Sequence, residues 1–554
     1  MSDSLFSILS SIHQETLLQY LDEKQQRNLY YDLTQFNKIY PGGIYSYINN
    51  AVNLLDDSLS GNKQISSIDI PTGKDLNIEN EEFEELEKIG RDALQTCCFA
   101  IVGGGIGERL HSKKAKLCLT SSLVSGQSFL ELYCCFFHSI ETQYDCTVPI
   151  AIMTSQGTHN QILSELESHD FFGLDKDNIT LMRQVEVPSI VDMKGTLALK
   201  PDGHLLLKPH GHGDIHTLLY QVDRFVLVLM QNNLPQRWLE MGKRHIIFMQ
   251  DTNILSLFGF APLLGVSIQS SLDFSSLGIV RKPGEKIGSI CRLEYPDSRK
   301  LTCNIEYNEF ETLLRRLTGE GDEPNDNGNS SYPGNINILC ASIESYNRIL
   351  LQTHGSIPEF INPKFADASH RFFSSPARLE CMMQDLPKIM TQKETVGYCS
   401  LPRWICFSAA KNSFENATIQ ESKTGFGESM FSAEEDYYKW FRKVGRKFGI
   451  DVGTKEWDDS VTPAHGLPQL PLLALSPQAV LTVSDMKKRF SGEITMSPTS
   501  LVYIDGTDVT LENVSVDGAL VVRACPQAKV VIRNIAVQNK GWKFEHCASD
   551  PSRS

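Results

Sequence analysis

Short apolar segments followed by helical patterns dominate the middle of the chain. Residues 98–102, 148–153 and 245–249 are rich in apolar residues, and each is followed by a stretch with the apolar spacing of a helix. Alternation of strand and helix is typical of an open α/β sheet, in which ligands bind beyond the carboxyl ends of the strands. The pattern therefore predicts a central sheet flanked by helices, with functional residues in the loops after these strands.

The two ends of the chain have different patterns. Residues 1 to about 90 alternate helical patterns with a polar stretch, and residues 81–88 place Phe83 and Leu86 on one face of a Glu-rich helix. Near the other end, apolar runs recur between Asn, Asp and Gly corners at 501–504, 509–511, 514–516, 519–522, 530–532 and 535–537. Short strands at this spacing favour a small β-helix-like or sandwich domain that acts as a cap or assembly module.

These patterns divide the chain into three parts. We expect a helical N-terminal region over residues 1–90, a catalytic domain over 91–455 and a C-terminal β-rich domain over 456–554, since 554 residues exceed what one core normally supports. Residues 318–331 are nearly all turn formers and acids, which predicts an exposed insertion without a role in chemistry.

Composition and charge restrict the class of partner. The formal net charge of −15 disfavours a broad surface for nucleic acid or anionic membranes, which requires clustered positive charge. The longest apolar run, residues 225–230, is too short to span a bilayer, and the N-terminus lacks the basic region of a signal peptide. We therefore expect a cytoplasmic protein with no nucleic-acid or membrane partner. Separately, we expect a monomer.

Fourteen cysteines are scattered along the chain. None forms a Cys-x-x-Cys motif or a Cys/His cluster with zinc spacing, so reduced and mostly buried thiols are expected.

A glycine-rich segment, residues 102–110, carries the strongest sign of chemistry. This glycine loop reads Val-Gly-Gly-Gly-Ile-Gly-Glu-Arg-Leu directly after a predicted strand, and Lys113, Lys114 and Lys116 follow it. Glycines after a strand let backbone N–H groups approach a phosphate closely, and the lysines supply positive charge. The spacing fits neither a dinucleotide fingerprint nor a P-loop. A phosphate-binding loop is therefore favoured, with an ordinary tight turn as the alternative.

A second motif, residues 208–214, reads Lys-Pro-His-Gly-His-Gly-Asp and is called the histidine loop below. Its Pro and two Gly predict an irregular loop, with Asp214 as N-cap of the following helix. His210, His212 and His216 could be zinc ligands, but no further Cys/His set supports this reading. We favour a loop whose backbone lies against a flat base, which is another use of glycine.

Polar residues follow in two further places. Asp251 lies at the carboxyl end of a predicted strand, in Gln-Asp-Thr-Asn at 250–253, where a carboxylate could hold Mg²⁺ that bridges phosphates. The alternative is an Asp satisfied by its own neighbours. Amides and carboxylates that suit sugar hydroxyls occur at 304–307, 333–337 and 378–380, although each set alone is unspecific.

Taken in order, these motifs resemble the uridylyl-transferring pyrophosphorylases that make nucleotide sugars, most closely the broad-specificity UDP-sugar pyrophosphorylases. The glycine loop is similar to the family's L-x-G-G-x-G-x-R-L followed by a lysine, and Met-Arg-Gln at 182–184 resembles its uracil-reading motif. The histidine loop is nearly K-P-H-G-H-G-D, and residues 250–253 match Q-D-T-N. The resemblance covers roughly residues 90–415 and implies a Rossmann-like nucleotidyltransferase of the GT-A type with a mixed central sheet.

The resemblance also implies roles for individual residues. Lys116 stands at the position of the catalytic lysine, with Lys411 and Arg109 as further catalytic residues, and Asp251 would hold Mg²⁺. The implied nucleotide-binding set is Val102, Gly104, Gly105, Gly107, Gln184, Gly211 and His212. The implied sugar-binding set is Asn253, Glu306, Tyr307, Asn335, Asn337 and Glu380. The partners would be UTP, sugar 1-phosphates, UDP-sugars and pyrophosphate.

The chain departs from the family pattern in the glycine loop and after it. His111 stands where the family usually has Gly, Thr120 where it has Pro, and "LAGG" reads Val-Gly-Gly-Gly at 102–105. These changes keep Lys116 in place. We expect them to alter loop shape and nucleotide affinity more than reaction type.

The implied reaction is reversible: UTP and a sugar 1-phosphate give a UDP-sugar and pyrophosphate. Both reactants are anions, so Lys116, Lys411 and Mg²⁺ would offset charge repulsion while the loops align the reactants. The attacking oxygen is already ionised, which accounts for the absence of a Ser/His/Asp or paired-carboxylate motif. Two alternatives stay open: a narrow UDP-N-acetylglucosamine or UDP-glucose pyrophosphorylase, and a catalytically silent UDP-sugar sensor, against which the two lysines argue.

Overall fold

The computed structural model describes residues 2–60, 65–221, 233–367, 372–452, 460–525 and 527–544. The apolar run at 225–230 and Cys547 lie outside the described residues. Within these ranges, no helix has both the length and the apolar character needed to cross a bilayer. All thirteen cysteines in them are free thiols and most are buried, as predicted.

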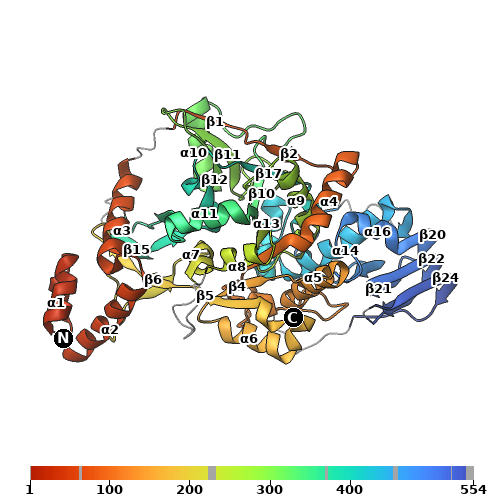
Figure 1. Ribbon diagram of the computed structural model, residues 1–554, viewed down its shortest axis with the longest axis horizontal. Helices are drawn as coiled ribbons and strands as arrows, with labels where there is room; N and C mark the ends of the chain where they lie inside the picture. The colour runs from red at the N-terminus through yellow and green to blue at the C-terminus, as the bar shows by residue number, and fades with distance from the viewer. Residues whose placement is uncertain are drawn as a thin grey trace.

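A mixed sheet forms the centre of the molecule, in the order β2-β17-β10-β13-β9-β3-β4-β5 (Figure 1). Every strand of this path runs in the same direction except β13, which is antiparallel to β9 and β10. The strands are β2 Gly73–Asp75, β3 Cys97–Val102, β4 Ile150–Thr154, β5 Ile179–Arg183, β9 His245–Met249, β10 Phe274–Ile279, β13 Gly334–Ser342 and β17 Val396–Leu401. The predicted mixed α/β sheet is confirmed, and so are the three strands predicted around residues 100, 150 and 247.

Helices cover both faces of this sheet, and the sequence of β3 shows why. Cys97, Phe99 and Ile101 face one hydrophobic core, whereas Cys98 and Ala100 face another, as the alternating side chains of a strand buried on both faces should. The first core includes residues of α4 Glu81–Ala93, α5 Phe129–Tyr144 and α9 Phe260–Gln269. The second includes α7 Asp214–Gln221, α8 Leu234–Glu240 and α11 Ile343–Thr353. Helix α4 buries Phe83 and Leu86 as the sequence predicts.

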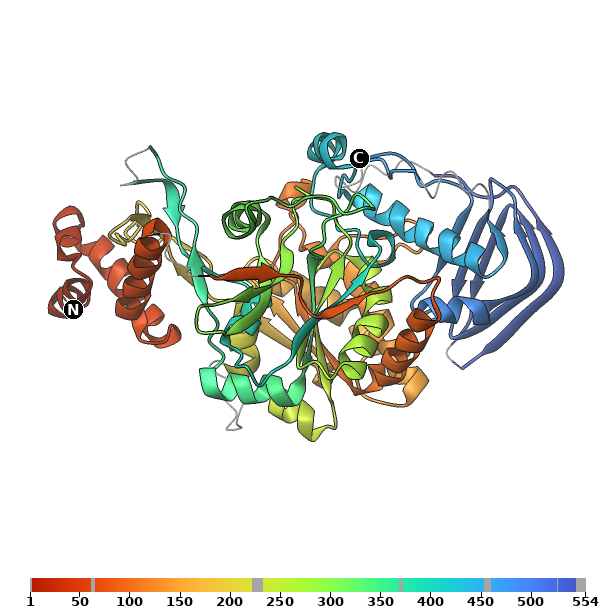
Figure 2. The same ribbon diagram turned by 90° about the horizontal axis from the view of Figure 1, so that it is seen from above.

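The first three helices lie at one end of the molecule (Figures 1 and 2). They are α1 Ser2–Ser11, α2 Glu23–Ile39 and α3 Gly43–Ser60. Their core is shared with short strands from later in the chain, among them β6 Glu186–Pro188, β7 Ile190–Asp192, β8 Leu207–Pro209, β14 Glu359–Ile361, β15 Phe372–Ala377 and β16 Leu379–Cys381. Strands β1 Ser67–Asp69 and β2 instead join the central sheet, so a boundary at residue 90 stays a prediction.

Two parallel sheets form the opposite end (Figure 2, in blue). One has the order β18-β20-β22-β24 and the other β19-β21-β23. Their strands are β18 Ile450–Val452, β19 Leu472–Leu475, β20 Phe490–Met496, β21 Leu501–Asp505, β22 Asp508–Asp517, β23 Ala519–Arg523 and β24 Lys529–Gln538. Since β18 lies before residue 456, the predicted domain boundary there also stays a prediction.

The prediction of six separate short strands in this region is wrong in two places. The runs at 509–511 and 514–516 are one strand, β22, and those at 530–532 and 535–537 are one strand, β24. Asn513 and Asn534 interrupt the apolar pattern with left-handed φ values of 52° and 53°, which asparagine tolerates well. The Asn513 side chain donates a hydrogen bond of 3.0 Å to that of Asn534. The asparagines that the sequence suggests as turns therefore form a ladder between two continuous strands.

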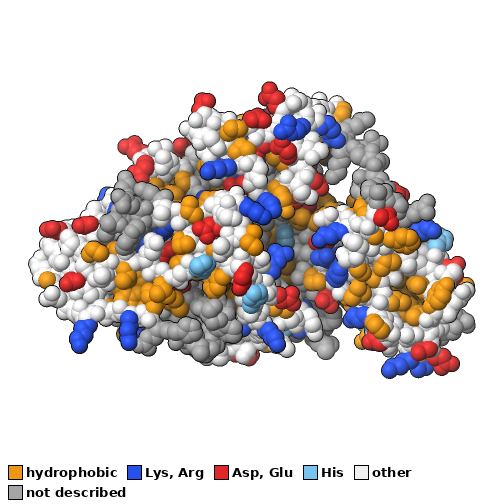
Figure 3. Space-filling model, turned by 180° about the vertical axis from the view of Figure 1, so that it is seen from behind, with side chains coloured by type: hydrophobic (Ala, Val, Ile, Leu, Met, Phe, Trp, Pro, Cys, Tyr) orange, Lys and Arg blue, Asp and Glu red, His pale blue; other side chains and the backbone are white. Residues whose placement is uncertain are grey.

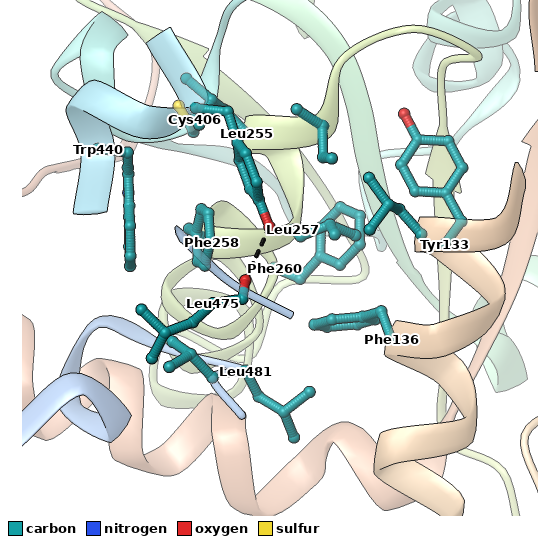
Figure 4. Packing of buried hydrophobic residues seen from close by; sticks show 14 of the residues in the cluster. Tyr133, Phe136, Leu255, Leu257, Phe258, Phe260, Cys406, Trp440, Leu475 and Leu481 are labelled. Atoms are coloured by element: carbon teal, nitrogen blue, oxygen red, sulfur yellow. Dashed lines mark hydrogen bonds between the residues drawn. The ribbon is translucent and has the colours of Figure 1, made fainter. Parts of the chain in front are cut away.

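A packed aromatic core joins the parallel sheets to the central sheet (Figure 4). Phe258, in the segment between β9 and α9, stacks on Trp440 of α14 Met430–Lys447 with ring centroids 3.5 Å apart. Tyr437 of the same helix donates a hydrogen bond of 3.0 Å to the carbonyl of Leu475 in β19. Helix α14 therefore contacts both parts.

Two further strands, β11 and β12, extend the central sheet beside β13, and five further helices complete the described structure. They are β11 Ser289–Glu294, β12 Lys300–Ile305, α6 His159–Ser168, α10 Tyr307–Thr318, α12 Arg403–Cys406, α13 Phe414–Thr424 and α16 Val483–Arg489. The insertion at 318–331 follows α10 and exposes most of residues 323–328, as predicted. It is anchored, however, by a buried ion pair of 2.7 Å between Asp322 and Arg281.

Candidate active site

The direction of the strands brings the predicted motifs to one edge of the sheet. The glycine loop follows β3, Gln184 follows β5 and Asp251 follows β9, so all three lie at the carboxyl ends of parallel strands. Because β13 runs the other way, its first residues reach the same edge. On the face shown in Figure 3, Lys, Arg and His side chains gather around a hollow near the middle of the molecule.

The glycine loop packs directly against the predicted metal ligand and the predicted catalytic lysine. A Cβ atom added at Gly105 would lie 2.6 Å from Oδ2 of Asp251 and 3.2 Å from Cδ of Lys116. The backbone N–H of Lys116 donates to the Gly105 carbonyl at 3.0 Å. Any side chain at position 105 would therefore displace the carboxylate or the lysine, which explains the glycine.

Lys116 and Asp251 face each other without a tight ion pair. The Nζ to Oδ1 distance is 3.9 Å, and 21% of the Lys116 side chain is exposed. Burial raises the pKa of Asp251, whereas the nearby Lys116 and Lys411 ammonium groups and a hydrogen bond from Thr252 oppose the rise. The Lys116 ammonium thus stays available to a further anion.

The Gln-Asp-Thr-Asn segment also positions Lys411. Thr252 donates its side-chain hydroxyl to the Ala410 carbonyl at 2.9 Å, and the Ala410 N–H donates to the Thr252 carbonyl at 3.1 Å. Lys411 itself is 46% exposed, and its Nζ lies 3.7 Å from Oε2 of Glu428 and 5.3 Å from the ring centre of Phe407. Two lysines far apart in sequence therefore flank Asp251.

Asn253 is placed differently from the other predicted sugar-binding residues. It is buried, its Nδ2 donates to the Cys406 carbonyl at 3.0 Å, and its Oδ1 accepts from the Ser408 N–H at 3.0 Å. These bonds fix the chain segment that leads to Lys411. Contact with a sugar stays a prediction for Asn253.

Gln184 lies between the two glycine-containing loops. Its Nε2 donates a hydrogen bond of 2.7 Å to the Gly211 carbonyl, and a Cβ added at Gly104 would lie 3.1 Å from its Oε1. Gly211 has φ +134°, and a Cβ there would lie 2.2 Å from the Cys381 carbonyl oxygen. The structure thus brings together Gly104, Gln184 and Gly211, which the sequence assigns to the nucleotide.

The histidine loop is held by a buried network that the sequence did not predict. His210 donates from Nδ1 to Asp214 at 2.6 Å and from Nε2 to Glu359 at 2.8 Å. Burial lowers the pKa of His210, but the charge of Asp214 and hydrogen bonds to Asp214, Cys381 and Glu359 raise it well above its ordinary value. Glu359 also accepts hydrogen bonds from Tyr40 and Asn50, which ties the loop to the N-terminal helices.

The other two histidines are neutral and do not share a site with His210. His212 accepts a hydrogen bond of 3.0 Å from the Met383 N–H, and burial lowers its pKa to about 4. His216 accepts from Tyr346 and donates to the Met383 carbonyl, and burial lowers its pKa to about 4. Helix α7 begins at Asp214, so the predicted N-cap at that residue is wrong by one position.

His210, Asp214 and Cys381 have ligand types that a metal could use. Both ring nitrogens of His210 lie within hydrogen-bond distance of carboxylate oxygens, however, which only accept, so both nitrogens donate and the ring is held as a cation. A cationic imidazole has no lone pair for a metal, so this cluster is a hydrogen-bonded brace for the loop.

A chain of amides and carboxylates forms the predicted sugar side. Asn335 donates to Asn304 at 3.3 Å, and Asn304 donates to Oε1 of Glu306 at 2.7 Å. Gln384 donates to the same Glu306 oxygen at 3.4 Å. Burial raises the pKa of Glu306, although the hydrogen bonds from Asn304 and Gln384 oppose the rise.

Asn337 lies at a bulge where the pairing of β13 with β10 shifts, and its φ is 57°. Its backbone N–H donates to Oδ1 of Asn335 at 2.9 Å, so the bulge fixes the Asn335 amide within this cluster. Tyr307, the first residue of α10, is 47% exposed.

Four predicted residues lie apart from these clusters or contribute only backbone. Arg109 is exposed in the short helix after the glycine loop, and the structure gives it no polar partner among the described residues. Glu380, in β16, pairs with Arg378 at 3.1 Å. Val102 ends β3. Gly107 donates its N–H to the Lys114 carbonyl at 3.0 Å, which closes the loop.

His111 adopts the left-handed conformation, with φ 56°. A glycine reaches this conformation without steric cost, so the loop keeps the backbone shape that the family's usual glycine would allow. Lys116 consequently keeps its place despite the departure from the motif.

Sequence reasoning missed Gln384, Glu359 and Ser155. Gln384 and Glu359 lie far along the chain from their partners Glu306 and His210, so no local spacing connects them. Ser155 follows β4 directly, and its Cβ would lie 3.7 Å from a Cβ atom added at Gly104. Its position after a predicted strand was the one available signal.

Similarity to known proteins agrees with this geometry. Residues 50–232 match the family described as UTP–glucose-1-phosphate uridylyltransferase. The UDP-sugar pyrophosphorylase of Oryza sativa subsp. indica is 33% identical over 542 residues, which are 95% of this chain and 85% of that protein. The Arabidopsis thaliana UDP-sugar pyrophosphorylase shows the same identity and coverage. The UDP-N-acetylglucosamine pyrophosphorylase of Saccharomyces cerevisiae is 24% identical over 307 residues, 53% of this chain and 60% of that protein.

Solved structures share the fold at lower identity. The Trypanosoma brucei uridine diphosphate N-acetylglucosamine pyrophosphorylase has a TM-score of 0.65 and 16% identity, and the match covers 88% of this chain and 94% of that one. A UDP-glucose pyrophosphorylase mutant from Leishmania major has a TM-score of 0.51 and 15% identity, covering 94% of this chain and 100% of that one. These solved structures share the overall fold. The near full-length 33% identity shows that this chain belongs to the UDP-sugar pyrophosphorylase family.

Proposed function

We propose that this protein transfers a uridylyl group from UTP to a sugar 1-phosphate, giving a UDP-sugar and pyrophosphate in a reversible reaction. The observation that carries the proposal is the convergence of Lys116 and Asp251 on the glycine loop, with the Lys411 ammonium near Asp251. The named relatives at 33% identity are UDP-sugar pyrophosphorylases, and acceptance of several sugars, including glucose, galactose, pentose and uronic acid 1-phosphates, fits that name.

The chemistry requires charge neutralisation more than proton transfer. An oxygen of the sugar phosphate attacks the α-phosphorus of UTP, a P–O bond forms, and the bond to the β-phosphate breaks with its electron pair leaving on pyrophosphate. Lys116 and Lys411 lie 3.9 and 3.7 Å from their carboxylate neighbours and keep exposed surface. Each can therefore donate to phosphate oxygens in the transition state, when the negative charge is redistributed.

Gln184 explains the choice of uracil in this proposal. Its Nε2 is committed to the Gly211 carbonyl, which leaves Oε1 as an acceptor at the edge of the glycine loop. Uracil presents an N3–H donor to such an acceptor, whereas cytosine presents an acceptor at N3. The fixed amide thus favours UTP over CTP.

Asp251 is suited to hold Mg²⁺. It is a buried carboxylate at a strand end beside the glycine loop, and Mg²⁺ is commonly bound by one or two carboxylates together with substrate phosphates. When bound, the ion would neutralise charge on the UTP phosphates. The same carboxylate orients Lys116, whose Nζ faces it.

The finer features of the fold are proposals of the same kind. The mixed sheet with its reversed strand suits the GT-A type of nucleotidyltransferase, and the two stacked parallel sheets suit a short β-helix. We assign the sugar to the cluster of Asn335, Asn304 and Glu306. We also propose that the protein acts as a monomer.

Pyrophosphate release from UTP and Mg²⁺ tests the proposal with 1-phosphates of glucose, galactose, xylose, arabinose, glucuronic acid and N-acetylglucosamine. Turnover of several non-acetylated sugars is expected. A single active sugar would indicate a narrow relative, and UDP-sugar binding by calorimetry with no turnover would indicate a sensor. Replacement of UTP by CTP should abolish turnover if Gln184 reads the base.

A further inference from the structure

A polar cavity lies between the central part of the molecule and the C-terminal parallel sheets. It has a volume of about 470 Å³ and is lined by the end of α4, the end of α5, residues 478–481, α16 and the start of β22. This volume lies within the range of small-molecule sites in proteins. In Figure 1, α4, α5 and α16 can be followed around this region.

The cavity is remote from the proposed active site. Arg91 lies on the last turn of α4, just before β3 begins, and Gln143 lies on the last turn of α5, just before β4. Both therefore lie at the amino ends of the strands, whereas the glycine loop and Asp251 lie at the carboxyl ends. Helix α5 spans about 24 Å between the two edges, because each residue of a helix rises 1.5 Å.

The walls of the cavity are fixed by buried hydrogen bonds. Glu87 of α4 accepts from the N–H groups of Val483 and Ser484 at 2.7 and 2.9 Å. Arg91 pairs with Asp485 at 3.0 Å, and Lys488 pairs with the same carboxylate at 2.9 Å. The negative charge of Asp485 is thus already matched by two cations.

Arg489 is the third cation of the cavity, and it forms no salt bridge with Asp485. Its Nε donates to the Ala479 carbonyl at 2.7 Å, and within the described residues neither of its terminal nitrogens has a hydrogen-bond partner or a salt bridge. Burial lowers the pKa of Arg489, whereas Asp485 and the exposed Asp508 oppose that effect. A half-buried guanidinium with free donors presents the fork that binds phosphate oxygens.

Most of the remaining lining is polar and uncharged, although Ala479, Leu481 and Asp508 also belong to it. Ser139, Thr142 and Gln143 come from α5, Gln478 precedes α16 and Thr507 precedes β22. Hydroxyl and amide groups of this kind pair with the hydroxyls of a carbohydrate as donors and acceptors. Three cations and two carboxylates line the cavity, so its lining carries an excess of positive charge. The chain as a whole, in contrast, has a net charge of −15.

We propose that this cavity binds a phosphorylated polyhydroxy compound, with the phosphate on Arg489 and Lys488 and the hydroxyls on the polar side chains of α5, Gln478 and Thr507. The site is separate from the uridylyl-transfer site and does not depend on the proposed reaction.

Calorimetric titration with glucose 6-phosphate and with inorganic phosphate tests the site in the full chain. Neither probe carries the 1-phosphate group that the proposed reaction uses. Wild-type protein should bind both, and Arg489→Gln should weaken both affinities about tenfold or more, because a charge-assisted contact is lost. Lys487→Gln removes the same charge from an exposed residue of α16 outside the cavity and should bind as wild type.

Two further variants separate this site from the active site. Lys116→Ala should leave binding of both probes unchanged, and Arg489→Lys should recover part of the affinity lost in Arg489→Gln. The proposal is overturned if wild type binds neither probe at millimolar concentration, if Arg489→Gln binds as wild type, or if Lys116→Ala abolishes binding.

Discussion

The two halves of the proposed active site hold their charges in opposite ways. On the phosphate half, Lys116 and Lys411 lie 3.9 and 3.7 Å from their carboxylate partners and remain partly exposed. On the histidine half, the charged ring of His210 makes contacts of 2.6 and 2.8 Å with the buried Asp214 and the partly buried Glu359. Charges meant for a substrate are held loosely, whereas the charges that shape the histidine loop make close contacts with one another within the protein. The contrast predicts that substitutions on the first half affect rate and that those on the second affect stability.

The sharpest test of the phosphate half is Lys116→Ala. Removing a donor to charge that develops in the transition state should lower kcat about 10²–10³-fold. The thermal midpoint should stay close to that of wild type, since no tight ion pair is lost. Steady-state rates and calorimetry on the same preparation measure both. Lys114→Ala removes an exposed lysine of the same segment as a control, and comparable rates for the two variants would contradict the role of Lys116.

Glu359→Gln tests the histidine half. The change leaves the His210 cation with one carboxylate and weakens the contacts to Tyr40 and Asn50, so unfolding should cost about 3 kcal/mol less. Denaturant titration measures the loss, and kcat should fall far less than in Lys116→Ala. Glu344→Gln, on an exposed position of α11, is the matched control. An unchanged midpoint in Glu359→Gln would show that the network does not brace the loop.

The pH dependence of stability sharpens the same contrast. Because the pKa of His210 is raised on folding, the folded protein holds a proton that the unfolded chain releases above about pH 6.5. The stabilising effect is complete below that pH and is lost as the pH rises toward the folded pKa, with a slope of up to about 1.4 kcal/mol per pH unit.

Comparison of wild type with His210→Gln isolates this effect from other groups, such as Glu87, whose pKa burial raises to about 7. Free energies of unfolding from pH 6 to 9 should converge for the two proteins as the pH rises. Parallel curves would mean that His210 is neutral in the folded protein.

The smallest effect is expected at His111, on the phosphate half. A non-glycine residue at φ 56° is strained, and His111→Gly should stabilise the fold by up to about 1 kcal/mol, partly offset by the flexibility of glycine in the unfolded chain. His111→Ala keeps the strain and serves as the comparison. Equal midpoints for the Gly and Ala variants would show that the loop relaxes its backbone.

Local sequence patterns predict the phosphate half better than the histidine half. Strand β3, the glycine loop and Lys116 are close in sequence, and Asp251 follows a strand of clear apolar character. The His210 network depends on Glu359, which lies 149 residues away, and on Tyr40, 319 residues from Glu359. Hydrogen bonds between such distant positions leave no periodic signature, because they arise only once the cores have packed.

The fold shows the same division. Runs of apolar residues locate β3, β4 and β9, because strands buried on both faces need continuous apolar sequence. The C-terminal runs mislead where Asn513 and Asn534 stand, since a polar residue in left-handed conformation resembles a turn in sequence but continues the strand in space.

The asparagine ladder shows the length of the sequence repeat in the C-terminal sheets. Asn513 and Asn534 are 21 residues apart and lie side by side on neighbouring strands, so 21 residues advance the stack by one turn. Each turn contacts mainly the turns before and after it. We therefore expect insertion or deletion of 21 residues, one whole turn, to restore the hydrogen-bonding register between the strands on either side of the junction.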